Sequence, residues 1–223
     1  MMLEDAGVAY EDVVLDYTQI VVSTGPKLDS GFSSNFAPPL VQKINEIGEV
    51  VFQISQLSAV LEYLAEDLGV FLPADIQQRG YARQVANDLA DFGSDGFAPF
   101  HAKNKHAGYT EQKDEPEVIQ AIAEYQAEGT GRLRKWLGHF ESFLAAAERR
   151  GTGGQPYFAS GEEPTYVDFY AYQFFLGYNT SYSNCLEKYP RINALMRALE
   201  QRPRLQAYLA SDRRWELTGN SCC

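Results

Sequence analysis

The segment that constrains the fold most is residues 36–65, with the sequence FAPPLVQKINEIGEVVFQISQLSAVLEYLA. Its two short apolar runs, Leu40-Val41 and Val50–Ile54, are separated by a turn at Gly48, and this pattern predicts two adjacent antiparallel strands. Two prolines stand directly before the first strand, where a cis peptide bond serves a tight turn. After the second strand, apolar residues at one-face spacing predict an amphipathic helix, and these residues are Ala59, Val60, Tyr63 and Leu64.

This order of elements predicts a binding site that needs no catalytic side chain. The start of an α-helix carries backbone N–H groups that have no acceptor within the helix, and these groups attract carboxylates. Gln56 and Ser58 stand where the helix is expected to begin. The segment is therefore predicted to hold an anionic peptide.

Length and composition exclude several classes of protein. The 223 residues fit one large domain or two small ones. Nucleic-acid binding is not expected, because the chain has 30 acidic against 19 basic residues and a net charge of −11. No apolar run reaches the length of a membrane-spanning helix, and the acidic start is wrong for a signal peptide. Three cysteines cannot form a disulfide framework, so a reducing, cytoplasmic location is expected.

The two halves of the chain differ in pattern. Strand and helix signals are mixed in the first seventy residues, whereas everything after Pro73 favours helices. The sequence therefore predicts a mixed domain over 1–70 and an all-helical domain over 76–215, joined by a linker at Leu68–Asp75. One-sided helical spacing is clearest in a set of seven residues: Leu133, Trp136, Leu137, Phe140, Phe143, Leu144 and Ala147.

Local signals also predict where helices break and begin. Gly129 and Gly131 weaken the helical stretch 116–149 and predict a kink or a split there. Thr165 and Asp168 stand three positions apart, directly before the apolar run Phe169–Tyr178. This spacing predicts a capping box with Asp in place of Glu, which is a structural feature rather than a catalytic one.

Taken in order, these landmarks resemble a family. The chain is similar to cytosolic glutathione transferases, especially the sigma-like and fungal or protist types. The landmarks that carry this resemblance are Pro-Pro before a strand, then ISQLSAVLEYL, a linker, TYVDFYAY and the ending YPRINALMRALEQRPRLQAYLASDRR. The resemblance spans nearly the whole chain. It implies an α+β protein with a thioredoxin-like N-terminal domain, an all-α C-terminal domain and a homodimeric assembly.

The resemblance also implies residues that bind glutathione. In the family, the residue before a cis-proline gives its backbone N–H and C=O to the cysteinyl part of the ligand. If Pro38 is cis, Ala37 makes both bonds; if Pro39 is cis, the preceding residue is Pro38, which has no N–H. The needs of the ligand favour Pro38, although the strand register also permits Pro39.

The γ-glutamyl group is expected at the start of the helix after the second strand. Gln56 matches the family glutamine that, with the next residue, fixes this group. The next residue in the family is usually Ser or Thr, but here it is Leu57. Ser58 is then either a substitute hydroxyl or an N-cap residue.

The N-terminal end departs from the family pattern. Family members begin with a strand and a loop that bears a Tyr or Ser hydroxyl, followed by a helix similar to Met1–Ala6. The given sequence starts inside that helix, so the first domain is expected to lack its first strand and no catalytic residue is assigned. Tyr10 and Tyr17 lie on the wrong side of the helix to replace the hydroxyl.

The expected activity of a complete form is conjugation of the glutathione thiol to a hydrophobic electrophile, a detoxification reaction in which glutathione is a co-substrate and no metal takes part. Two alternatives remain. One is a non-catalytic binding or structural module with the same fold, and the other is a glutathione-binding regulator. The sequence does not identify the acceptor substrate.

Overall fold

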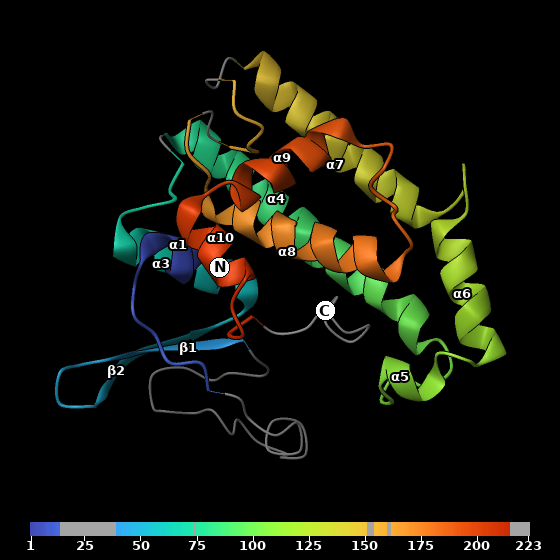
Figure 1. The fold of residues 1–223 in the computed structure, drawn as a ribbon, viewed down its shortest axis with the longest axis horizontal. Coiled ribbons are helices and arrows are strands. Elements are labelled where there is room, and N and C mark those ends of the chain that lie inside the picture. Colours follow the sequence, from blue (N-terminus) through green and yellow to red (C-terminus); the bar gives the residue numbers. More distant parts are fainter. Residues whose placement is uncertain (14–38, 74, 151–153, 160–161, 215–223) are drawn as a thin grey trace. The chain divides into compact units, whose positions relative to one another are not determined.

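The structure is a computed structural model that describes residues 1–13, 39–73, 75–150, 154–159 and 162–214 (Figure 1). The chain divides into two compact units. One is Ala9–Leu72, and the other combines Met1–Val8 with Pro73–Cys223. The sequence predicts domains over 1–70 and 76–215, and it therefore assigns Met1–Val8 to the first domain rather than to the helical one. These bounds stay a prediction.

In the first unit, the predicted strand-turn-strand-helix order is present. Strand β1 (Leu40–Ile44) pairs antiparallel with β2 (Val50–Ser55), and helix α3 (Leu57–Leu68) follows after a single residue. Gly48 has a φ of 85° in the connecting turn, a conformation that glycine adopts without a Cβ clash. The turn and the strands therefore arise from the local pattern that the sequence shows.

Side chains fasten α3 to this hairpin. The rings of Phe52 and Tyr63 stack with centroids 4.4 Å apart, and Lys43 Nζ lies 2.6 Å from a carboxylate oxygen of Asp67. Across the hairpin, Gln42 Nε2 donates to Oε1 of the buried Gln53 at 2.7 Å. The first two contacts hold the middle and the end of α3 against the hairpin.

In its described residues, the second unit contains only helices as regular elements. They are α1 (Met2–Ala6), α4 (Ile76–Phe97), η1 (Ala98–His101), α5 (Tyr109–Gln112), α6 (Pro116–Gln126), α7 (Arg132–Arg149), α8 (Tyr166–Ser181), α9 (Pro190–Glu200) and α10 (Pro203–Leu209). The predicted split in 116–149 is confirmed, because α6 ends before Gly129, which has a φ of 82°, and α7 begins after Gly131.

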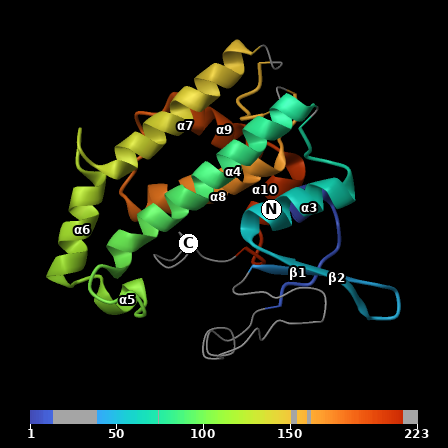
Figure 2. The ribbon, with the colours of Figure 1, turned by 180° about the vertical axis from the view of Figure 1, so that it is seen from behind.

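Aromatic side chains form the core where α4, α7 and α8 meet. Phe92 on α4 stacks on Tyr178 of α8 with centroids 4.1 Å apart and packs edge-on against Phe140 of α7 at 5.4 Å. All three residues are fully buried. Helices α4 and α8 run alongside each other in both views of the ribbon (Figures 1 and 2). Burial of such large apolar surfaces is the main stabilising contribution to this unit.

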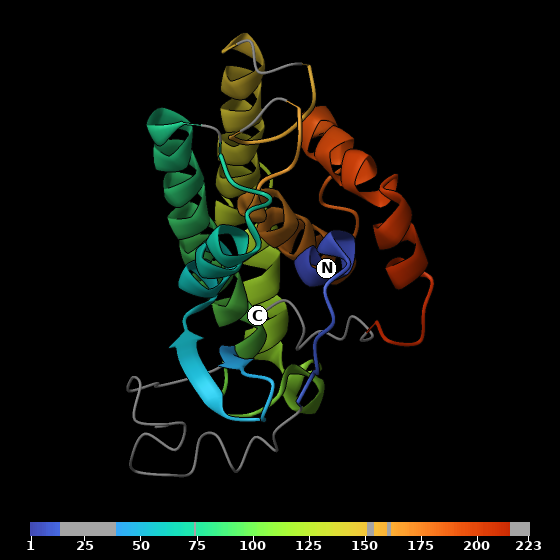
Figure 3. The same cartoon turned by 90° about the vertical axis from the view of Figure 1, so that its left-hand side faces the viewer.

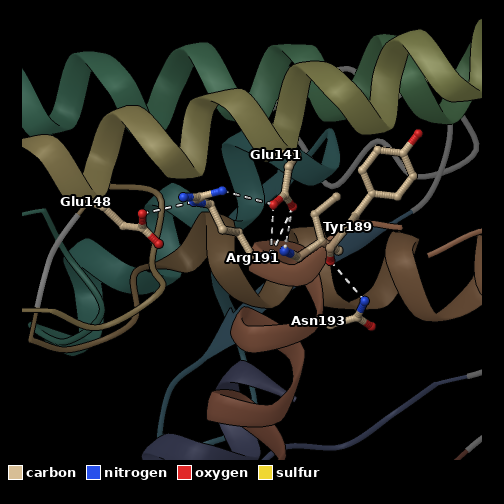
Figure 4. Close-up of polar contacts among 6 residues, drawn as sticks. Glu141, Glu148, Tyr189, Arg191 and Asn193 are labelled. Atoms are coloured by element: carbon tan, nitrogen blue, oxygen red, sulfur yellow. Dashed lines mark hydrogen bonds and ion pairs between the residues drawn. The ribbon is translucent and has the colours of Figure 1, made fainter. Parts of the chain in front are cut away.

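A carboxylate of α7 caps the start of α9 (Figure 4). Glu141 accepts hydrogen bonds from the backbone N–H groups of Arg191 and Ile192, at 3.0–3.1 Å. The Arg191 guanidinium in turn donates to Glu148 at 2.9 Å and reaches Glu141 at 3.4 Å. Helix α9 has no capping side chain of its own, so Glu141 of α7 satisfies its first N–H groups.

Helix α1 packs against α10 within the same unit (Figure 3). Arg202 Nε donates to the buried carboxylate of Asp5 at 2.6 Å, and Arg213 pairs with Glu4 through two hydrogen bonds. Arg202 also reaches Glu163 at 2.9 Å. Charged pairs thus fasten the first helix to the last.

The predicted capping box at Thr165 is present at the start of α8. The Asp168 carboxylate accepts from the Thr165 N–H at 2.7 Å and from the Thr165 hydroxyl at 2.9 Å. It also accepts from the Phe158 N–H at 2.9 Å, a bond that the sequence pattern does not predict. Asp168 therefore holds the preceding loop as well as the helix start.

Candidate functional site

The start of α3 has the geometry of an anion-binding helix terminus. Gln56 is the N-cap residue, with φ 72° and ψ 111°, which is an uncommon conformation for a residue other than glycine. Its side chain is exposed and makes no capping bond to the helix. The first bond of the helix runs from the Val60 N–H to the Gln56 carbonyl, and N–H groups before it have no acceptor within a helix.

Gln56, Leu57 and Ser58 thus stand together at this terminus, as consecutive residues of one turn. Leu57 and Ser58 are half-buried, and Leu57 brings no hydroxyl to the site. A carboxylate at this position would be held by backbone N–H groups and the Gln56 amide. Such an arrangement fits a carboxylate ligand, because helix N-termini favour anions.

The hairpin register brings the start of β1 to the same place. Leu40 pairs with Ser55, so the chain enters β1 beside the point at which it leaves β2 for α3. Ala37 and Pro38 lie outside the residues that the structure describes. Their roles, and the choice between Pro38 and Pro39 as the cis-proline, stay predictions.

Four aromatic residues of the second unit, near the start of α8 and on α5, serve mostly as core residues. Tyr166, Phe169 and Tyr172 are each 2% exposed. Tyr172 donates its hydroxyl to Glu200 at 3.0 Å, and burial raises the pKa of this hydroxyl above its ordinary value. Tyr109 is half-buried and packs edge-on against Phe100. These contacts explain the residues as packing groups.

A cluster of charged and aromatic residues between α4 and α7 is absent from the sequence-based assignment. His139 Nε2 lies 3.0 Å from Asp88, while Arg132 Nε and Trp136 Nε1 both donate to Asp95, at 2.6 and 2.8 Å. The sequence carries one signal for this cluster. The acidic pair on α4 and the basic pair on α7 are each spaced by seven residues, so that each pair shares one helix face.

Among the residues that the structure describes, there is neither a metal-binding cluster nor a membrane-spanning helix. No group of three or more His, Cys, Asp or Glu side chains there is placed to hold a metal ion. No helix in that part is long and apolar enough to cross a membrane.

Comparison with protein families gives one match. Residues 102–212 match the family model of the C-terminal domain of glutathione S-transferase. This region runs from the end of η1 to the residues after α10 and includes the capping box at Thr165. Comparison of the sequence with curated proteins finds no match.

Solved structures with the same fold cover most of the chain. A monomeric glutathione S-transferase of the hookworm Necator americanus has a TM-score of 0.69 at 16% identity, covering 96% of this chain and 90% of that one. Prostaglandin synthase D of Nilaparvata lugens has a TM-score of 0.68 at 18% identity, with coverage of 96% and 90%. The glutathione S-transferase of Ascaris lumbricoides has a TM-score of 0.65 at 17% identity, with coverage of 97% and 91%.

These likenesses confirm the predicted α+β class, with a thioredoxin-like first domain and an all-helical second domain. The sigma-like subtype stays a prediction. The solved structures show that this chain shares the fold of glutathione S-transferases, and the sequence match over residues 102–212 places it in the glutathione S-transferase family.

Proposed function

We propose that this protein binds glutathione at the start of α3 and conjugates its thiol to hydrophobic electrophiles. The observation that carries the proposal is the exposed N-terminus of α3, opened by Gln56 in a left-handed conformation beside the entry to β1. Helix N–H groups and the Gln56 amide bind the γ-glutamyl carboxylate. Ala37, before Pro38, would bind the cysteinyl backbone.

In the conjugation itself, the thiol loses its proton and the thiolate sulfur forms a bond to the electrophilic carbon, from which a leaving group departs. A thiolate is required because a free thiol with a pKa near 8.5 is only a few per cent ionised at neutral pH. No residue of this chain is assigned to activate the thiol. On the basis of family membership, the proposal includes a cytoplasmic location of the protein and a homodimeric assembly.

Binding is tested by calorimetry of the full chain with glutathione and with cysteinylglycine, which lacks the γ-glutamyl group. We expect glutathione to bind at least about tenfold more tightly, because only glutathione has the carboxylate for α3. Gln56→Ala should weaken glutathione binding and leave cysteinylglycine unchanged. Gln120→Ala, at an exposed glutamine of α6, is the matched control. Equal affinity for the two peptides would contradict the site.

The second candidate function is a non-catalytic module that binds glutathione. Leu57 favours it, since this position provides no hydroxyl for the ligand. Turnover of 1-chloro-2,4-dinitrobenzene with glutathione separates the two functions. Tight binding without turnover above the uncatalysed rate would support the module, and turnover that Gln56→Ala slows would support the transferase.

A further inference from the structure

A cleft of about 240 Å³ opens on the helical unit between α4 and α7. Asp88 of α4 lines it on one side. The other side consists of four residues of α7: Arg132, Lys135, Trp136 and His139. The cleft thus combines one aromatic surface with several charged groups.

The aromatic wall is held in place from two directions. Trp136 Nε1 donates to Asp95 at 2.8 Å, which fixes the orientation of the indole. Its ring stacks on Phe140 with centroids 6.0 Å apart and packs against Phe92 at 5.9 Å. The side chain is nevertheless only half-buried. Part of a flat, immobilised indole therefore faces the cleft.

The residues that line the cleft carry two permanent cations, Arg132 and Lys135, against one carboxylate, Asp88. The Asp88 carboxylate is engaged by His139, and Asp95 by Arg132 Nε. The ammonium of Lys135 is exposed and has no partner in the described part of the chain. Asp91 follows Asp88 on the same face of α4, but it does not line the cleft. An ammonium beside a partly solvated guanidinium attracts anions even in a protein whose net charge is −11.

We propose that this cleft binds a small aromatic carboxylate, with its ring on the Trp136 indole and its carboxylate on Lys135 and Arg132. An aromatic ring gains from contact with a fixed indole, since flat rings stack with little loss of freedom. A cation is disfavoured because the single carboxylate that lines the cleft stands against two permanent cations, Arg132 and Lys135. The site is independent of the proposed function at α3.

Fluorescence of Trp136 tests the proposal directly. The chain contains two tryptophans, so Trp215→Phe leaves Trp136 as its single indole. We expect saturable quenching by benzoate, and binding of the neutral isostere benzamide to be about tenfold weaker, because benzamide lacks the charge. Added salt should weaken benzoate binding and leave benzamide binding unchanged. Absence of saturable benzoate binding, or equal binding of the two probes, overturns the proposal.

Substitutions then locate the site. Lys135→Gln should weaken benzoate binding about three- to fivefold, as expected for loss of one exposed ion pair. Lys113→Gln, at an exposed lysine outside the cleft, should leave it unchanged. Asp91→Asn should strengthen it slightly by removing a nearby negative charge. An equal effect of both lysine substitutions overturns the assignment to this cleft.

The alternative to a small molecule in this cleft is a second copy of the chain, and ultracentrifugation distinguishes the two. A dimer that Lys135→Glu dissociates and benzoate leaves intact would show that the cleft is covered by protein, and this result also overturns the proposal. An unchanged sedimentation coefficient on benzoate binding and on substitution of Lys135 supports a small-molecule site.

Discussion

The hydroxyl oxygen of Tyr178 lies in the space where residue 96 would carry a side chain. A Cβ atom at Gly96 would be 1.8 Å from that oxygen, far inside van der Waals contact. The same hydroxyl donates to the Phe92 carbonyl oxygen at 2.6 Å, and Tyr182 donates to the Gly96 carbonyl at 2.9 Å. Glycine at this position therefore permits the close approach of α4 and α8 and the hydrogen bonds between them.

Gly96→Ala should lower the free energy of unfolding by about 3 kcal/mol, at the upper end of the usual cost of overpacking a core. Tyr178 has to move away from α4, and its hydroxyl then loses the Phe92 carbonyl. Urea denaturation measures the change. Gly80→Ala in the same helix is the control, because a Cβ atom there meets nothing within 4 Å. This control should gain about 0.5–1 kcal/mol from helix propensity. Equal stability of the two variants would contradict the close contact.

Asp168 should matter more to stability than the capping residue with which it pairs. Thr165→Ala removes one hydroxyl and should lower the free energy of unfolding by about 1 kcal/mol. Asp168→Ala removes the acceptor for the N–H groups of Phe158 and Thr165 as well, in a fully buried site. We expect a loss of about 3 kcal/mol or more, since each unsatisfied buried donor costs about 1–3 kcal/mol. Equal losses in thermal or urea denaturation would show that the bond to Phe158 contributes nothing.

The pKa of Asp168 gives stability a defined pH dependence. Burial raises this pKa from 3.8 to about 6, although the N–H and hydroxyl donors around the carboxylate lower it. The folded state thus binds the proton more tightly than the unfolded state, and the contribution to stability falls as pH rises from about 4 to about 6. Relative to Asp168→Asn, the wild-type protein should lose up to about 3 kcal/mol across this range. A wild-type advantage that grew with pH would contradict the raised pKa.

Leu57→Ser should strengthen glutathione binding. A hydroxyl bonded to a carboxylate contributes about 1.5–3 kcal/mol, whereas the backbone N–H groups of α3 remain after any side-chain change. Calorimetry should therefore show an affinity increase of about 10- to 100-fold. Leu57→Ala controls for the loss of the leucine side chain and should bring no such gain. If Leu57→Ser and Leu57→Ala bind glutathione equally, the γ-glutamyl group does not lie at this residue.

Much of the fold could be predicted because its signals are local. The hairpin and α3 follow from strand runs, a glycine turn and helical spacing within residues 40–68. The break at Gly129 and the capping box at Thr165 depend on a few neighbouring positions. Of the candidate glutathione site, the sequence predicted that Gln56 opens the helix, but not its left-handed conformation, which depends on how β2 turns directly into α3.

What the sequence determined by itself is thus the hairpin with α3, the helical character of the second part, the capped start of α8 and the apolar face of α7. The tertiary structure decided which faces meet. Asp5 pairs with Arg202 from the other end of the chain, Glu141 caps a helix fifty residues away, and Asp88 meets His139 across α4 and α7. Helical periodicity shows which side of a helix is buried but not which helix covers it. Such pairs depend on the packing of the aromatic core, which fixes the neighbours of every helix at once.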